Sequence, residues 1–246
     1  VVFSGDQGGQ LYIRGGSPIM NKVLLDGMTI YNPFHSIGLF SVFDTDILKT
    51  TDVYSAGFSA EYGGRISAIV DVQTRDGNRN QMSGKLNVNP FTAKALIEGP
   101  LKSKDKEGKA NASYIVSYKN SYLDQTSNLF YNYVGENQLP YSFSDLYTKL
   151  SLNSKSGSFL KLFYFDYNDL VDFPNTTTYD WKSSGFGGKF LMVPQSSKNI
   201  IDGSFAYSKY NIDQIEQDAQ PRSSGIDGFN LGLNFSYFMK DAKLKY

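Results

Sequence analysis

The fold is decided by QLYIRGGSPIMNKVLLDGMTIYNPF (residues 10–34) and DILKTTDVYSAGFSAEYGGRISAIVDVQTRD (residues 46–76). Short apolar runs alternate in these stretches with glycines, which permit tight turns because they carry no Cβ atom. Asp26-Gly27 is a strong signal for a two-residue hairpin turn. Strands are expected at 11–14, 22–25, 28–31, 51–55 and 68–74, and short helical turns at 44–47 and 58–64. The two stretches therefore predict a small α+β domain.

Five pieces of these stretches, in this order, resemble a known family: IRGG at 13–16, VLLDG at 23–27, YNPF at 31–34, EYGG at 61–64 and AIVDVQTRDG at 68–77. Together they resemble the plug domain of TonB-dependent outer-membrane receptors. The forms RGGSP, YNPFH, FSVF and YGGR are similar to those of Bacteroidetes-type bacteria in particular. The resemblance implies that the domain fills the lumen of a large β-barrel. It also places the plug motif and the plug–barrel lock at Arg14, Gly15, Gly16, Asp26, Gly27, Glu61, Tyr62, Gly63, Gly64 and Arg65.

Arg14 is the charged residue of most interest, because it lies between an isoleucine and two glycines and a guanidinium is costly to bury unpaired. In the family, the arginine of the IRG motif pairs with acids of the barrel wall, and Arg14 matches its position. A second arginine of the family has Ala56 in its place here. Either the charged cluster is smaller in this chain or Arg65 substitutes. On the residues alone, a solvated arginine at a strand end is an equally good interpretation of Arg14.

The composition of the 246-residue chain excludes several classes of function. Lysine plus arginine and aspartate plus glutamate number 24 each, so no net charge favours nucleic acid, and no basic run indicates a nucleic-acid groove. The chain has no cysteine, which excludes disulfides, zinc–thiolate clusters and thiol chemistry. No apolar stretch approaches the roughly 18 residues of a membrane helix. A membrane location would therefore require a β-barrel, because only helices and closed barrels satisfy their backbone there.

Most aromatic residues lie in the second part of the chain, which indicates a domain boundary. The polar, turn-rich sequence RDGNRNQ at 75–81 marks it. We expect the C-terminal part of the plug domain at 1–78 and the N-terminal part of the transmembrane barrel at 82–246. The chain would then be a fragment of a longer receptor.

After residue 82 the sequence alternates with the period of two that is typical of β-strands. FNLGLNFSYFMK at 229–240 places Phe229, Leu231 and Leu233 on one face and Asn230 and Asn234 on the other. Strands are expected at 83–89, 91–98, 110–119, 145–153, 158–168, 182–193, 199–213 and 229–240, with a ninth near Lys243, and long loops at 121–140, 170–180 and 214–225. The predicted fold class is membrane all-β: eight or nine strands of a large antiparallel barrel of roughly 22 strands, after a small α+β plug.

A soluble β-sandwich is the alternative, because its strands also alternate. Most of the expected strands are longer than the usual length of about 5–6 residues in globular domains. They suit the roughly 9–11 residues that a strand needs to cross a membrane. The strand lengths therefore favour the barrel.

Catalytic signals are weak. His35 is the only histidine, and no G-x-S-x-G sequence accompanies it, so a structural role is the better interpretation. Residues 76–80 begin like a calcium loop but lack its glycine and its closing glutamate. We expect no enzyme, no cofactor and no bound metal. Weak candidates for ligand binding are the aromatic residues Tyr122, Tyr131, Tyr133 and Trp181, which could stack on a sugar or a siderophore or could equally pack within their loops.

The resemblance implies a receptor in the outer membrane of a Gram-negative bacterium. Such a receptor binds a scarce nutrient (siderophore-bound iron, a glycan, a cobalamin-like compound or a peptide) and imports it when the plug moves. Its expected partners are a TonB-type energy-transducing protein in the periplasm, outer-membrane lipid, the nutrient and a surface lipoprotein, but not nucleic acid. An adhesion or binding barrel without transport is the alternative.

Overall fold

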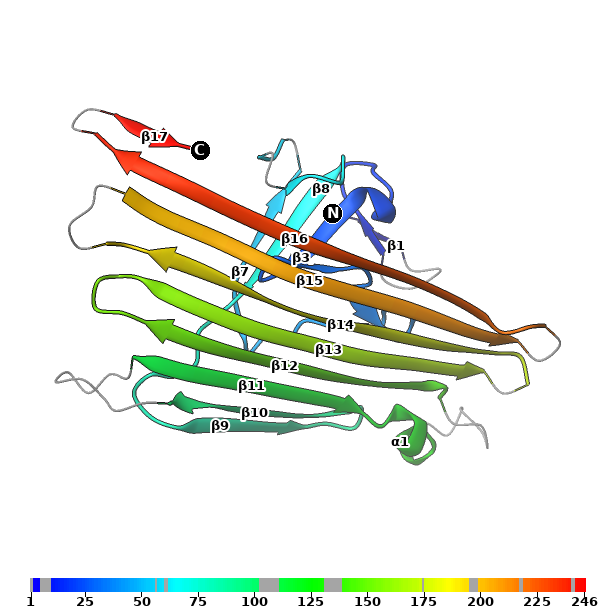
Figure 1. The fold of residues 1–246 in the computed structure, drawn as a ribbon. Coiled ribbons are helices and arrows are strands. Elements are labelled where there is room, and N and C mark those ends of the chain that lie inside the picture. The colour runs from blue at the N-terminus through cyan, green and yellow to red at the C-terminus, as the bar shows by residue number, and fades with distance from the viewer. Residues whose placement is uncertain are drawn as a thin grey trace.

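The computed structural model describes residues 2–4, 10–55, 57–59, 62–101, 111–130, 139–173, 175–194, 199–216, 219–239 and 242–246. Two parts are visible in Figure 1. The N-terminal unit comprises the described residues between 2 and 76, and the large sheet comprises nine antiparallel strands between residues 83 and 245. The predicted fold class, a small unit followed by strands of one large antiparallel wall, is confirmed. None of the described helices is long and apolar enough to span a membrane.

The strands of the large sheet follow one another in chain order, each antiparallel to the next, with β9 and β17 at the two described edges. They are β9 (Ser83–Val88), β10 (Thr92–Pro100), β11 (Ala112–Ser121), β12 (Tyr141–Asn153), β13 (Phe159–Phe173), β14 (Thr177–Met192), β15 (Asn199–Glu216), β16 (Arg222–Phe238) and β17 (Lys243–Lys245). All nine strands predicted from the period-two pattern are present.

The connections between the longest strands are shorter than expected. The long loop expected at 170–180 is wrong, because β13 and β14 run through most of it. A short turn that contains Asn175, with φ 62, joins them. The threonine run at 176–178 favours extended backbone, and this preference outweighs the loop signal of the segment. The connection expected at 214–225 is shortened from both sides by β15 and β16. The expected loop at 121–140 contains an α-helix, α1 (Leu123–Phe130), that was not predicted.

The N-terminal unit is built on a four-stranded sheet with the order β4-β3-β8-β7, in which β3 and β8 are parallel. Its strands are β3 (Asn21–Leu25), β4 (Met28–Ile30), β7 (Leu48–Tyr54) and β8 (Ala68–Thr74). Shorter elements are β1 (Val2–Ser4), β2 (Gln10–Tyr12), η1 (Pro18–Met20), β5 (Phe34–His35), η2 (Ser36–Gly38) and β6 (Phe40–Ser41). The predicted hairpin is confirmed: Asp26 and Gly27 join β3 to β4 with φ 51 and 96.

The helical turn expected at 44–47 is wrong. The Asp44 carboxylate accepts a hydrogen bond from the Asp46 backbone N–H at 2.9 Å, and the Ile47 N–H donates to the Asp44 carbonyl at 3.2 Å. Aspartate often stabilises a turn in this way by bonding to its own backbone two residues on. Strand β7 begins at Leu48, so the chain makes one turn and no helix. The other expected helical turn, at 58–64, includes residues 60 and 61, which lie outside the described residues.

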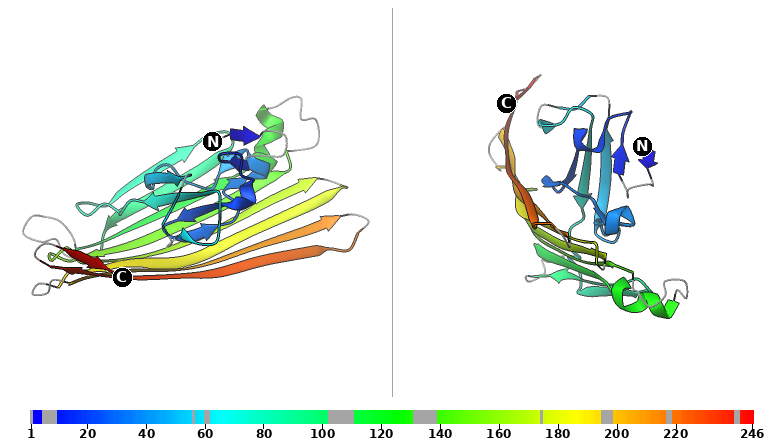
Figure 2. Two further views of the ribbon diagram at one scale, coloured as in Figure 1. Left: turned by 90° about the horizontal axis from the view of Figure 1, so that it is seen from above. Right: turned by 90° about the vertical axis from the view of Figure 1, so that its right-hand side faces the viewer.

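The large sheet is curved, and the N-terminal unit lies against its concave face (Figure 2). On β16, Asn230 donates to the Thr29 hydroxyl of the unit at 3.4 Å. The alternate residues Phe229, Leu231 and Leu233 are 62%, 75% and 52% exposed. The apolar residues of β16 therefore point away from the unit, as predicted from the alternation.

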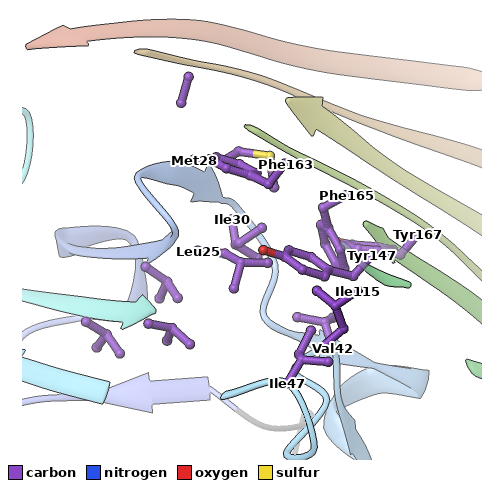
Figure 3. Close-up of a cluster of buried hydrophobic side chains, with 14 of the residues drawn as sticks. Leu25, Met28, Ile30, Val42, Ile47, Ile115, Tyr147, Phe163, Phe165 and Tyr167 are labelled. Carbon is purple, nitrogen blue, oxygen red and sulfur yellow. The ribbon is translucent and has the colours of Figure 1, made fainter. Parts of the chain in front are cut away.

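A continuous cluster of buried side chains joins the two parts (Figure 3). The N-terminal unit contributes Leu25, Met28, Ile30, Val42 and Ile47, and the large sheet contributes Ile115, Tyr147, Phe163, Phe165 and Tyr167. Fully burying one such side chain contributes roughly 1.5–3 kcal/mol. The interface between the unit and the sheet is therefore part of the hydrophobic core.

Candidate functional site

The β3–β4 hairpin of the N-terminal unit is pressed against β14 and β15. Met28, which is fully buried, lies over Gly185: a Cβ atom at Gly185 would come within 2.2 Å of the Met28 Sδ. The missing side chain thus makes room for the hairpin. Next to it, the Thr29 N–H donates to the Ser208 Oγ at 2.9 Å.

A buried polar network surrounds Asp26 in the turn of this hairpin. The Asp26 carboxylate accepts hydrogen bonds from the Tyr147 hydroxyl at 2.6 Å and from the Thr74 hydroxyl at 2.5 Å. The Lys149 Nζ lies 3.5 Å from the Asp26 carboxylate and donates to the Thr74 Oγ1 at 2.8 Å. Tyr147 and Lys149 are two residues apart on the concave face of β12, so one strand supplies both partners. Charge-assisted hydrogen bonds of this kind are stronger than neutral ones, particularly away from water.

The segment that follows β8 is tied to three strands of the large sheet. The Asp76 carboxylate lies 2.9 Å from the Lys161 Nζ of β13 and accepts from the Ser151 hydroxyl of β12 at 2.9 Å. Burial alone would raise the pKa of Asp76, but its hydrogen bond and charge pairing with Lys161 outweigh burial and lower the pKa. The Arg75 guanidinium pairs with both carboxylate oxygens of Glu98 on β10, at 2.5 and 3.0 Å.

A second acidic turn of the N-terminal unit binds lysines of the large sheet. The Asp44 carboxylate lies 2.8 Å from the Lys94 Nζ and accepts from the Ser117 hydroxyl at 2.5 Å. Asp46 pairs with the same Lys94 and, at 2.7 Å, with Lys85. Hydrogen bonds from Lys85 and Lys94 lower the pKa of Asp46. This turn is therefore an anionic contact to β9, β10 and β11.

His35 forms the fourth charged contact and is completely buried. Its Nε2 lies 2.6 Å from the Asp145 carboxylate and its Nδ1 lies 3.6 Å from that of Asp169. The imidazole stacks on the Phe143 ring with centroids 4.3 Å apart. Asp145 is also 2.6 Å from the Lys119 Nζ. Burial alone would lower the pKa of His35, but its contacts with Asp145 and Asp169 outweigh burial and raise the pKa above its ordinary value.

Only part of the predicted motif lies at this interface. Asp26 and Gly27 do: a Cβ atom at Gly27 would lie 3.6 Å from Lys189 of the large sheet. Arg14 occupies an exposed turn with φ 51 and forms no ion pair within the described part of the chain. Its neighbour Gly15 has φ 75. The lock role of Arg14 stays a prediction.

The remaining motif residues lie within the N-terminal unit. A Cβ atom at Gly16 would collide with Ser67, which explains the need for glycine there. Tyr62 stacks on Tyr54 with ring centroids 5.3 Å apart. The Gly63 carbonyl accepts a hydrogen bond from the Lys22 Nζ at 3.2 Å, and the exposed Arg65 donates to the Gly64 carbonyl at 2.9 Å. Glu61 and Ala56 fall outside the described residues. A lock role for Arg65 also stays a prediction.

The aromatic ligand candidates are divided between local packing and the undescribed part of the chain. The Tyr122 hydroxyl donates to the Thr92 carbonyl at 3.1 Å, and Trp181 stacks on Tyr179 with centroids 5.3 Å apart. Tyr131 and Tyr133 lie outside the described residues. Ligand binding by these residues stays a prediction.

The wall side of the interface was not predicted from sequence. Its main polar members are Lys94, Glu98, Asp145, Tyr147, Lys149, Lys161 and Asp169. A signal for them exists, because they are charged or hydroxyl-bearing residues at the positions that alternate with the apolar outer face. The alternation identifies the face, but not which residue of the N-terminal unit each one meets.

A family model described as the TonB-dependent receptor plug domain matches residues 1–69. A comparison with curated proteins finds no match. Similar solved structures include the siderophore receptor PirA from Acinetobacter baumannii, with 14% identity and a TM-score of 0.61 over 93% of this chain and 39% of that chain. The FrpB iron transporter from Neisseria meningitidis has 14% identity and a TM-score of 0.63 over 92% of this chain and 38% of its own. The ferric citrate transporter FecA in its unliganded form has 14% identity and a TM-score of 0.63 over 95% and 39%.

The chain spans about two fifths of the length of these three structures. Their low identity makes the likeness one of fold, and it covers the N-terminal unit and the large sheet together. Residues 1–69 therefore match the TonB-dependent receptor plug domain, and the N-terminal unit docked on the large sheet has the same fold as these receptors and transporters, as the sequence motifs indicated.

Proposed function

We propose that this chain is part of an outer-membrane receptor that binds a scarce nutrient and imports it through a pore closed by the N-terminal unit, from here on the plug. The docking of the plug on the concave face of the large sheet is the observation that carries this proposal. The plug is held there by the networks around Asp26, His35 and the Asp44–Asp46 turn. A solute that passes along this face requires the plug to move.

The outer face of the large sheet supports a location in a membrane. Tyr164, Phe186, Tyr207 and Phe229 occupy directly paired outward positions on β13 to β16 and form an aromatic row. The next outward residues on the side of the β13–β14 and β15–β16 connections are Asp166, Ser184, Lys209 and Asp227. On the opposite side of the aromatic row, the next outward residues include Leu162, Phe205 and Leu231, which begin an apolar band. A row of aromatics between an apolar band and polar residues is typical of the interface of a transmembrane β-barrel.

The nutrient and the partners are proposed from the fold and the family. The similar structures are named for a siderophore, iron and ferric citrate, so an iron chelate is the first nutrient to test; a glycan, a cobalamin-like compound or a peptide follows. A TonB-type periplasmic protein would supply the energy, and transport needs no covalent chemistry. The division into a plug at 1–78 and a barrel wall at 82–246 is supported by the end of β8 at Thr74 and the start of β9 at Ser83. The similarity to Bacteroidetes-type receptors and a surface lipoprotein partner stay predictions.

Uptake by a strain that lacks the full-length gene tests the proposal. The probes are ferric citrate and ferric siderophores labelled with radioactive iron, and then oligosaccharides as sole carbon source. We expect uptake of one probe to be lost in the deletion strain, restored by the gene and abolished by an uncoupler of the proton-motive force. Parental uptake of every probe, together with loss of surface binding, would favour the adhesion alternative.

A further inference from the structure

His35 lies between two carboxylates that belong to different strands of the wall. Asp145 of β12 faces its Nε2 at 2.6 Å, and Asp169 of β13 faces its Nδ1 at 3.6 Å. A neutral imidazole carries one N–H group and one lone pair, whereas the imidazolium carries two N–H groups. Neither ring nitrogen makes an aligned hydrogen bond among the described residues, so these are charge contacts, and only the protonated ring supplies a positive charge to both acids.

The charges around His35 balance only when it is protonated. Lys119 on β11 neutralises Asp145 at 2.6 Å. Asp169 is 1% exposed, and within the described part of the chain it pairs with no lysine or arginine. The Ser36 N–H donates to one oxygen of Asp169 at 2.8 Å, and the other oxygen has no hydrogen-bond partner among the described residues. Tyr167, the other titratable group at this ring, packs edge-on against it and is neutral near pH 7.

We propose that His35 is a proton-operated latch: the plug docks on the wall with His35 protonated, and its release from the wall sets that proton free. The latch regulates the plug movement of the proposed function, and this regulatory role therefore rests on the proposed function. In the docked state, the positive charge of His35 on the plug stays paired with the carboxylates of Asp145 and Asp169 on the wall. Loss of the proton leaves Asp169 as a buried charge without a cation, which is strongly unfavourable.

The sign of the pH dependence follows from the raised pKa of docked His35. In the released plug, the exposed imidazole has its ordinary pKa of about 6.5. Below that pH both states are protonated, and the latch contributes fully. As the pH rises from there to the raised pKa, docking weakens by up to about tenfold per pH unit, because one proton is bound in the docked state only. Above the raised pKa, the contribution is lost.

Hydrogen exchange in the full-length receptor in detergent micelles tests the latch. The exchange rate of the amides at 34–43, which include β5 and β6, is measured by mass spectrometry from about pH 5 to about pH 9. His35 is the only histidine of this chain, so H35Q removes its only imidazole. The ratio of the parental rate to the H35Q rate cancels the intrinsic pH dependence of exchange. We expect this ratio to rise by up to about tenfold per pH unit above about pH 6.5 and then to level off.

D169N is the second variant, because its amide oxygen still accepts the Ser36 N–H while the carboxylate charge is removed. The rise in its exchange is expected to level off at a lower pH than in the parent. The ratio of the D169N rate to the parental rate also cancels the intrinsic pH dependence, so this comparison stands even where H35Q fails to assemble. A ratio that is constant across the range, or a D169N profile that levels off at the parental pH, would overturn the latch. The readout is docking and not uptake, so failure of the latch and failure of the transport proposal are distinguishable.

Discussion

Asp26 links the local fold of the plug to its docking on the wall. Aspartate is among the residues that tolerate the left-handed backbone that this hairpin turn needs, and Asp26 has φ 51. The same turn carries its carboxylate to the Tyr147 hydroxyl and close to Lys149. A hairpin signal that is visible in the sequence thus also marks a residue of the interface.

Asp26→Asn is expected to weaken plug docking by about 2 kcal/mol, because it leaves Lys149 buried beside a neutral amide. The amide keeps the turn and one hydrogen-bond acceptor. The measurement is the urea dependence of plug protection against protease in the full-length receptor. Asp52→Asn, at an exposed position of β7, is the control. It should change the free energy of plug docking by less than about 0.5 kcal/mol. Equal effects of the two substitutions would show that the Asp26 network does not hold the plug.

Strands and hairpins were predictable because their signals are local. The alternation after residue 82 gave all nine strands and the orientation of β16, and Asp26-Gly27 gave the β3–β4 hairpin. The pairing of Lys149 with Asp26 was not predictable, since it depends on the height at which the plug docks along β12. Helix α1 is not predicted because its segment, rich in aromatics and amides, resembles a loop, although Ser121 accepts the Leu123 N–H at 3.4 Å as a cap does. The sequence predicts a helix at the Asp44 turn, where the structure has none, because aspartate serves both as a helix cap and as a turn former.

The fit of the β4 hairpin against β14 gives a prediction at the scale of elements. Gly185→Ala places a methyl group within 2.2 Å of the Met28 Sδ and 2.4 Å of the Tyr207 carbonyl. We expect it to destabilise docking by about 1–3 kcal/mol, the usual cost of overpacking a core. The same protease assay measures it. Gly57→Ala is the matched control, because nothing lies within 4 Å of a Cβ atom there. Unchanged protection of the plug against protease in Gly185→Ala would mean that the hairpin does not pack tightly on β14.

At the scale of the whole molecule, the two faces of the large sheet differ in chemistry. The concave face carries the charged contacts to the plug, and the convex face carries an apolar band. Leu231→Arg, inside the band and 75% exposed in the absence of lipid, is expected to destabilise the receptor in a bilayer by about 2–4 kcal/mol. Asp227→Arg, beyond the aromatic row, should cost about 0–1 kcal/mol. Folding of the full-length receptor into lipid vesicles, followed against urea, measures both. Similar costs for the two substitutions would contradict the position assigned to the membrane.

The most direct test of the gating plug is a reversible tether between plug and wall. The chain has no cysteine, so T29C together with S208C introduces the only thiols of this region, at positions whose backbone N–H and hydroxyl are 2.9 Å apart. The measurement is uptake, by cells carrying the tethered full-length receptor, of the nutrient whose import the deletion strain loses. Each single cysteine variant is the control. The account predicts that uptake falls to the level of the deletion strain when the disulfide is formed and returns after reduction. Import at the parental rate with the disulfide intact would contradict it.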